Sequence, residues 1–451
     1  MNSTVNATIK AAVNSTWYPL KDWNNFEPFR IDALGLVTLL GAPEVNNNVG
    51  KLVRSKYLEY LPLLGAYIIA NDEFTDKQPG FQLYNINKSI YTPDIAGWFT
   101  RWLMAQDIRT AASCVDWNVE SVEHGFGLEI FISGLIGIIL NGGFIVLTVL
   151  MGDWWGFSNA MSMTASIVAR TYLVSRNRRW LDKAIENAIK RDDPRALRPI
   201  KDKSKTRIID QDSIAGLKWD RLIVVLSDAR AVIVRVPACL VVDCFVFNPK
   251  PPNATNETKR AKSLPPRQKQ EDKKPVSDPP QIKLYRFVRG VAWLAFGAHA
   301  ITIGMSKLVS QIVTVLIIVF PTILLTMGFG SDDMRVGSRL RANIFDFPHV
   351  SEAAQKRVDM YAFLNLTKDQ EDSLRRWGLA PHETNKAWWD DYEERKKRYN
   401  EDEIGRPKPL IDMVTFEERK NALVSRSKAA TQQPQKTGSV AMSCHTSHST
   451  T

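Results

Sequence analysis

A long uncharged stretch in the first half of the chain limits what this sequence can fold into. From Ile130 to Met151 it carries only one strongly polar side chain, Asn141. A helix rises about 1.5 Å per residue, so a run of about 22 residues can cross the ~30 Å of hydrocarbon in a bilayer. The sequence therefore predicts a membrane-spanning helix here, although the mean hydropathy of the whole chain, -0.20, is that of an ordinary globular protein.

Three further segments extend this prediction to about four spans in two hairpins, over 127–174 and 290–330. Trp154 and Trp155 are typical of the lipid–water interface, so we expect the chain to turn there and return. Two further apolar runs form the second predicted hairpin, Gly290–Ser306 and Leu308–Phe329. The predicted fold class is mainly α: a polytopic helical membrane protein with helical cytosolic segments. A soluble protein with two buried core hairpins is the alternative, but belts of arginine and tryptophan rarely cut apolar runs in a soluble core.

Lysine and arginine near the ends of the spans predict the orientation, because cytosolic loops carry an excess of both. The basic residues form three clusters, after the second span, before the third and after the fourth: Arg170, Arg176, Arg178 and Arg179; Lys283, Arg286 and Arg289; Arg335, Arg339 and Arg341. We therefore expect a cytosolic central loop, 175–289, and a cytosolic tail. Because two predicted spans separate the N-terminal soluble region, 1–126, from the central loop, this region is expected in the cytosol as well.

Glycosylation sequons near the N-terminus leave a second orientation possible, in which the N-terminus lies outside the cytosol. They lie at Asn2, Asn6, Asn14 and Asn87. A sequon is used only when its segment is translocated, which would need one more crossing. The one segment available is Tyr57–Ala70, and at about 14 residues it is too short for a confident span. We interpret it as a buried or interfacial helix.

The soluble segments have distinct patterns. Helix-like runs at Phe29–Leu40, Val49–Ala70 and Ile95–Met104 make the N-terminal region partly helical. Residues 220–247 are rich in Val and Ile, and their side chains follow an alternating pattern, which predicts a β-hairpin or meander. Residues 248–282 are rich in Pro, Lys and Ser, which predicts a disordered linker. This linker either attracts anionic lipid headgroups or is simply solvated.

The tail, 331–424, is predicted to be helical before a disordered end at 425–451. Ser351 can cap a helix through Leu364, and Thr367 with Gln370 forms a capping-box pattern for a second helix. Gly378 ends that helix and a third follows it. The aromatic side chains of this part are expected to form its core: Trp377, Trp388, Trp389 and Tyr392.

Several short phrases resemble a known group of proteins. They are the hairpin tip GDWWG, the Val-rich element of the loop, and the tail sequence LRRWGLAPHETNKAWWDDYEE. Together they resemble fungal multi-pass membrane proteins of uncharacterised function, over roughly residues 127–395. The resemblance implies the membrane architecture and carries no catalytic residue with it.

A search for catalytic chemistry is negative. The chain has no HExxH, GxSxG, GxxxxGK[ST] or complete GxGxxG motif, and its four cysteines, at 114, 239, 244 and 444, form no CxxC pair. We expect no enzyme activity, no cofactor and no metal site. Much of the net charge of +11 lies in the basic clusters at the ends of the predicted spans, which the membrane orientation explains. Nucleic acid is therefore not an expected partner.

Polar and small residues inside the spans are the remaining candidates. The polar ones are Asn141, Asn159, Arg170, His299 and Gln311, which either serve a pathway or relay or hydrogen-bond between helices. Gly290, Gly297 and Gly304 recur every seven residues and line one face, which predicts close contact with a neighbouring helix.

The expected function is that of a non-enzymatic membrane scaffold or signalling adaptor, in the plasma membrane or another endomembrane. The alternative is a small-solute transporter or channel component. The bilayer itself and an unidentified protein are the expected partners, and oligomerisation stays open.

Overall fold

An eight-stranded mixed sheet, which the sequence did not predict, holds three distant parts of the chain together. In this computed structural model the described residues are 42–106, 113–121, 127–193, 211–249, 280–346 and 357–401, with Leu20, Ile108 and Ile209. The strands occur in the order β1-β7-β8-β4-β6-β5-β2-β3. Their bounds are β1 Val53–Ser55, β2 Gln82–Asn85, β3 Ile90–Thr92, β4 Ser113–Val119, β5 Trp219–Val225, β6 Ala231–Pro237, β7 Ser331–Val336 and β8 Leu340–Asp346.

The prediction of a mainly α chain is therefore wrong. β4 pairs in parallel with β6 and antiparallel with β8, more than 100 residues away in each case. The predicted hairpin within 220–247 is present as β5 and β6, but the meander is not, because Val241–Val246 forms a π-helix, η3. The start of the tail, predicted as helical, forms β7 and β8.

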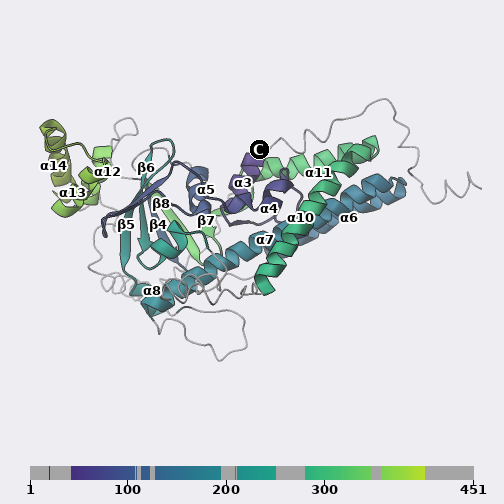
Figure 1. Cartoon of the computed structure of the whole chain (residues 1–451), viewed down its shortest axis with the longest axis horizontal. Helices are drawn as coiled ribbons and strands as arrows, with labels where there is room; N and C mark the ends of the chain where they lie inside the picture. Colours follow the sequence, from purple (N-terminus) through teal and green to yellow (C-terminus); the bar gives the residue numbers. More distant parts are fainter. Residues whose placement is uncertain are drawn as a thin grey trace, which may run out of the picture. The chain divides into compact units, whose positions relative to one another are not determined.

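Four long helices form a bundle, and one of them continues to the sheet (Figure 1). They are α6 (Leu128–Leu150), α7 (Trp154–Asp192), α10 (Pro280–Met305) and α11 (Leu308–Thr326). Three of them, α6, α10 and α11, are long and apolar enough to cross a membrane. This corrects the prediction of four such spans, because the first part of α7 has many small and polar residues and turns its polar Asn159 into the bundle.

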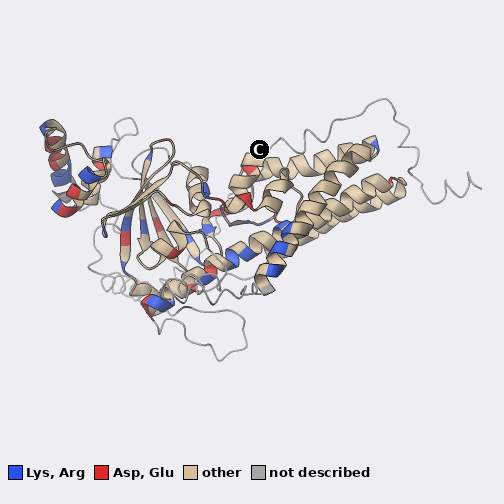
Figure 2. Cartoon of the chain, in the orientation of Figure 1, with Lys and Arg blue, Asp and Glu red and all other residues tan. Residues whose placement is uncertain are grey.

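The outer faces of these helices are apolar. Large exposed side chains include Phe131 and Ile138 on α6, Leu294 on α10, and Leu316 and Phe320 on α11, each more than 60% exposed. Figure 2 shows few charged residues along the middle of the bundle, whereas charges of both signs occupy the sheet and the second half of α7. This distribution is compatible with association of the bundle with a membrane.

The two hairpin tips are joined by one buried carboxylate. Asp153 accepts a hydrogen bond from the backbone N–H of Gly156, in the first turn of α7, at 3.0 Å. Its second oxygen accepts from the N–H of Lys307, which precedes α11, at 2.9 Å. Since the first N–H groups of a helix have no partner within the helix, Asp153 satisfies donors at the start of both returning helices.

Replacing Asp153 with alanine is expected to lower the free energy of unfolding by about 1 kcal/mol, the usual cost of a lost helix cap. Thermal unfolding of the detergent-solubilised chain would measure it. Asp228→Ala, at an exposed turn carboxylate that pairs with Arg230, is the matched control. Equal unfolding temperatures for Asp153→Ala and wild type would contradict the bridging role.

The second half of α7 packs on the sheet. Leu181, Ile185 and Ile189 recur every four residues and are fully buried. Asp182 accepts from the backbone N–H and the hydroxyl of Ser338, at 2.9 and 2.7 Å, in the turn between β7 and β8. α7 thus spans 39 residues, about 58 Å, and links the bundle directly to the sheet.

From residue 42 on, the described N-terminal part is less helical than predicted, and the predicted run Phe29–Leu40 lies outside the described residues. Its helices are α3 (Ala42–Gly50), α4 (Ala66–Asn71), η2 (Glu73–Thr75) and α5 (Gly97–Ala105). The predicted helix at Ile95–Met104 corresponds to α5. The predicted helix at Val49–Ala70 is wrong, because turns and β1 fill it up to α4, so Tyr57–Ala70 is neither a span nor a single helix.

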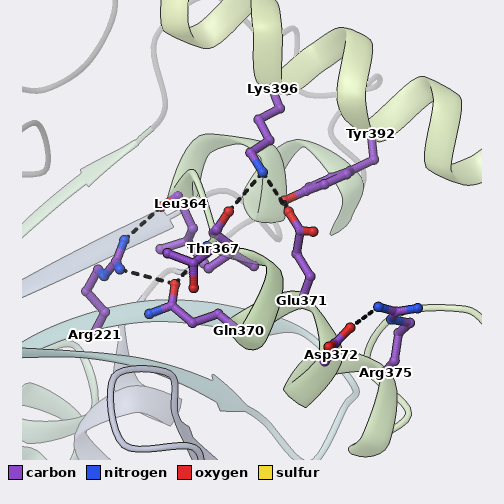
Figure 3. Close-up of polar contacts among 10 residues, drawn as sticks. Arg221, Leu364, Thr367, Gln370, Glu371, Asp372, Arg375, Tyr392 and Lys396 are labelled. Atoms are coloured by element: carbon purple, nitrogen blue, oxygen red, sulfur yellow. Dashed lines mark hydrogen bonds and ion pairs between the residues drawn. The ribbon is translucent and has the colours of Figure 1, made fainter.

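The tail helices follow the prediction more closely. They are α12 (Arg357–Leu364), α13 (Lys368–Arg376) and α14 (Lys386–Glu401), and the capping box of Thr367 and Gln370 is present. Arg221 of β5 donates to the Leu364 carbonyl at 2.8 Å, which attaches these helices to the sheet (Figure 3). Tyr392 is buried and donates to Glu371 at 2.8 Å. The linker at 250–279 and the tail at 425–451 lie outside the described residues.

The sheet also bears on the sequons. Asn87, in the turn after β2, donates to the Trp219 carbonyl of β5 at 3.1 Å, so it lies on the same side of the bundle as the central loop. If that loop is cytosolic, Asn87 is expected to carry no glycan in cells, and endoglycosidase treatment should leave its gel mobility unchanged. A glycan at Asn87 would place the whole sheet outside. Asn2, Asn6 and Asn14 lie outside the described residues.

Candidate functional site

Two of the predicted intramembrane polar residues meet inside the bundle. The Nδ1 of His299 lies 2.6 Å from the Oδ1 of Asn159, and the Nδ2 of Asn159 donates to the Thr314 hydroxyl at 2.8 Å. Asn141 and Gln311 instead donate to carbonyls of nearby residues in their own hairpins, Gly137 and Ser306. The sequence did not single out Thr314, since an uncharged threonine in a long helix gives little signal.

Arg170 lies apart from this group and closes the sheet-side end of the bundle. It donates to the carbonyls of Glu59 and Leu61, both at 2.7 Å. A cavity of about 30 Å³ separates it from His299. A cavity of that size holds one or two water molecules. The predicted polar residues therefore surround no continuous conduit among the described residues.

The three glycines of α10 do not make the predicted contact. A Cβ atom added at Gly290, Gly297 or Gly304 would meet no atom within 4 Å. His299, on the opposite side, is buried, and α10 packs through that side against α7 and α4. The predicted close contact of the glycine face with a neighbouring helix is therefore absent among the described residues, where this face is open.

A larger cavity, which we call the junction pocket, lies where α7 passes from the bundle to the sheet. Its volume is about 190 Å³. Its lining combines five aromatic or apolar side chains with polar ones from separate parts of the chain: Gly50, Leu52, Asp72, Phe74, Thr75, Trp98, Asn177, Trp180, Asn248 and Pro249. None of the residues predicted as sites lines it.

Strained backbone borders the junction pocket. Leu52 and Asp72 have positive φ angles, 59° and 71°, in the left-handed region that residues other than glycine rarely adopt. Asp tolerates this region better than Leu, for which the conformation costs about 1–2 kcal/mol. The Leu52 carbonyl is fixed by Arg178, whose Nε donates to it at 3.1 Å. Strain held in this way is concentrated at functional sites in proteins.

Asp72 connects the pocket to both helices of the bundle that pass it. Its Oδ1 accepts from the hydroxyl of Tyr285 in α10 at 2.6 Å. Asn177 of α7 donates to the same hydroxyl at 2.9 Å, and Arg289 lies 3.7 Å from the other carboxylate oxygen. Burial raises the pKa of Asp72 above its ordinary value, despite the opposing effects of Tyr285 and Arg289.

The pocket wall also contains an unused donor. The indole Nε1 of Trp180 is buried and has no hydrogen-bond partner among the described residues. Buried donors normally have a partner, so this one points to a bound molecule or water. By contrast, Asn248 is fully engaged: it accepts from the Gly97 N–H and donates to the Thr75 carbonyl, both at 2.6 Å. It follows the π-helix η3, a local irregularity that often marks functional sites.

Two kinds of reactive group can be described within these ranges. No group of three His, Cys, Asp or Glu side chains in the described ranges could hold a metal ion. Burial raises the pKa of Cys239 to about 11, so its thiol is protonated at neutral pH and is a poor nucleophile. The junction pocket has the Asp72 carboxylate and aromatic walls, which suit a small molecule with hydrogen-bonding groups.

Comparison with known proteins does not narrow this further. No protein-family model matches the chain, and neither curated proteins nor solved structures give a match. The resemblance to fungal multi-pass membrane proteins stays a prediction.

Proposed function

We propose that this chain is a multi-pass integral membrane protein that acts without catalysis, as a scaffold or signalling adaptor, and that its junction pocket binds a small polar ligand. The observation that carries the proposal is the continuity of α7. The same helix packs in the bundle through Ala160 and Met163, lines the pocket through Asn177 and Trp180, and packs on the sheet through Ile185.

A ligand in this pocket would touch both parts of the molecule at once. Asn177 belongs to α7, and its hydrogen bond to Tyr285 reaches α10. Asn248 follows the β5–β6 hairpin and η3. A ligand shifts an equilibrium only by binding one arrangement better than another, and contacts to both helices and to the sheet supply such a difference. This geometry supports an adaptor whose sheet responds to occupancy.

The ligand has to be small. The pocket volume of about 190 Å³ is below the ~300–1,000 Å³ of sites for drug-sized molecules. A donor on the ligand would approach the Asp72 carboxylate, and the Trp180 side chain would form part of the wall. Phe74 and Trp98 would cover its apolar surface.

Native mass spectrometry of the full-length protein purified from cells tests this. We expect wild type to retain a small non-covalent mass, and Asp72→Asn to lose it at least about tenfold more readily, because charge is removed while asparagine tolerates the same φ angle. Trp180→Phe should weaken retention without removing the ring. Asp94→Asn, at an exposed pair with Lys77, is the control. Wild-type retention in both pocket variants would reject the site.

The buried contact between His299 and Asn159 is the observation that favours the alternative, a small-solute transporter or channel component. The cavity of about 30 Å³ beside it weighs against a pathway. We expect His299→Ala in reconstituted vesicles to leave proton and cation flux unchanged, with a loss of stability near 1 kcal/mol for the missing hydrogen bond. A pH-dependent flux in wild type that disappears in this variant would favour transport over the adaptor.

A further inference from the structure

A second concave surface lies on the outer face of α7, outside the junction pocket. This groove has a volume of about 300 Å³. Its apolar end contains Ile167 and Val168, and its polar end contains Tyr172, Arg176 and Arg179. Tyr60, from the turn before α4, forms its side. The groove therefore changes from apolar to basic along the helix axis.

The change in character coincides with the end of the apolar surface of α7. Val168, 64% exposed, is the last large apolar side chain exposed on this helix. At ~1.5 Å per residue it lies about 21 Å from Trp154 at the hairpin tip, and Arg179 lies about 38 Å from it. A hydrocarbon layer of about 30 Å that begins at the tip would end between these two residues. The groove therefore crosses the expected boundary between acyl chains and headgroups.

The basic end is not neutralised by the described acidic residues around it. Arg176 donates to the Tyr172 hydroxyl at 3.1 Å and lies over its ring, whereas exposed Arg179 makes no ion pair among the described residues. Two acidic residues of neighbouring segments are engaged in other ion pairs. Glu59 pairs with Arg178 at 2.6 Å, and Glu129 pairs with Lys56 at 3.1 Å.

A buried hydroxyl in the groove also lacks a partner. The Oγ1 of Thr171 is inaccessible to solvent and makes no hydrogen bond among the described residues. A threonine in a helix commonly donates to the carbonyl three or four residues earlier. At the polar end of the same groove lie the guanidinium groups of Arg176 and Arg179, a type of side chain that is well suited to bind a phosphate.

We propose that this groove binds one anionic phospholipid from the surrounding bilayer. Arg176 and Arg179 contact its phosphate and headgroup, and an acyl chain lies along Ile167 and Val168. This site is separate from the basic linker at 250–279, and it rests on the proposed membrane attachment. Each arginine near an anionic surface strengthens such binding about fivefold at low salt, and salt weakens it.

The test uses full-length protein in phosphatidylcholine vesicles that contain spin-labelled phosphatidylserine or, separately, spin-labelled phosphatidylcholine. The fraction of label immobilised by the protein gives the preference for the anionic lipid. We expect that preference to fall about fivefold in Arg179→Gln and further in Arg176→Gln/Arg179→Gln. Thr171→Val removes a hydroxyl that is inaccessible to solvent, so it should leave the preference within twofold of wild type. Lys190→Gln/Lys218→Gln removes two exposed charges elsewhere and should leave the preference within twofold of wild type.

Three results would overturn the proposal. The first is a wild-type preference in Arg176→Gln/Arg179→Gln, which removes both positive charges from the polar end of the groove. The second is displacement of the labelled lipid by soluble glycerophosphate at equal concentration, which would assign the groove to a free phosphate. The third is the absence of immobilisation of either label in every variant, which would also reject the membrane attachment, whereas loss of preference alone would leave it intact.

Discussion

Replacing Arg178 with methionine is expected to lower the free energy of unfolding by about 3–5 kcal/mol, the usual result of breaking a buried ion pair. The Arg178 and Glu59 side chains are only 7% and 16% exposed, and they meet at 2.6 Å. Arg178 also donates to the carbonyls of Leu52 and Val53, at 3.1 and 2.6 Å. Methionine fills similar space but leaves a buried carboxylate and two carbonyls without their donor.

Chemical denaturation of the detergent-solubilised protein would measure the loss. The double variant Arg178→Met/Glu59→Leu is the control, since it removes both charges and should recover part of the stability. A loss below 1 kcal/mol in the single variant would contradict the buried pairing and would also remove the support for the strained Leu52 at the junction pocket.

The same pair predicts a pH dependence. Burial raises the pKa of Glu59, but the charge and hydrogen bond of Arg178, with the charges of Arg170 and Arg54, outweigh it, so the pKa lies below the ordinary 4.5. Because the folded-state pKa is depressed, this contribution is fully present above pH 4.5 and is lost as the pH falls through the lower folded-state value. In Arg178→Met that loss of stability on acidification should shrink or reverse.

The apolar spans could be predicted because their signal is local. Ile130–Met151 and Leu308–Phe329 need no partner elsewhere in the chain to be recognised, and α6 and α11 occupy them. The first part of α7 was misjudged for the opposite reason. Its polar residues face other helices instead of lipid, as Asn159 faces His299, so composition alone cannot distinguish it from an ordinary amphipathic helix.

The sheet could not be predicted, because its signal is distributed along the chain. β1 and β3 have three residues each, too few for a clear alternation, and β7 has the sequence Ser331–Val336 with two aspartates and one arginine. These strands are stabilised by neighbours that the chain supplies from distant segments. Only β5 and β6, joined by a short turn, carry a recognisable hairpin pattern.

The junction pocket was missed for a related reason. Its polar residues, Asp72, Asn177, Trp180 and Asn248, come from separate segments and form no motif. Asp72, two residues after the apolar run that ends at Ala70, was the only local signal. The positive φ angles and the unused Trp180 N–H, which identify the pocket, are properties of the folded backbone and its packing.

Glycine positions in the bundle lead to the second large effect. Gly137→Leu in α6 is expected to destabilise the protein by about 3 kcal/mol, because overpacking a close contact forces the backbone to move. A Cβ at Gly137 would lie 2.8 Å from the Cβ of Tyr60 and 2.9 Å from its carbonyl oxygen, neither of which is the end of a flexible side chain. Detergent thermal stability measures the effect.

Gly297→Leu in α10 is the matched control, with the same change of residue in a second apolar helix. No atom lies within 4 Å of a Cβ there, and leucine favours a helix more than glycine does, so stability should stay within about 0.5 kcal/mol of wild type or rise. Equal destabilisation by both variants would mean that a neighbour outside the described residues covers the glycine face of α10. Crosslinking between copies that carry a single cysteine at Gly290, or a single cysteine at Gly304, would then show whether that neighbour is a second copy of the chain, because close contact between parallel helices across small residues brings the same position of both copies together.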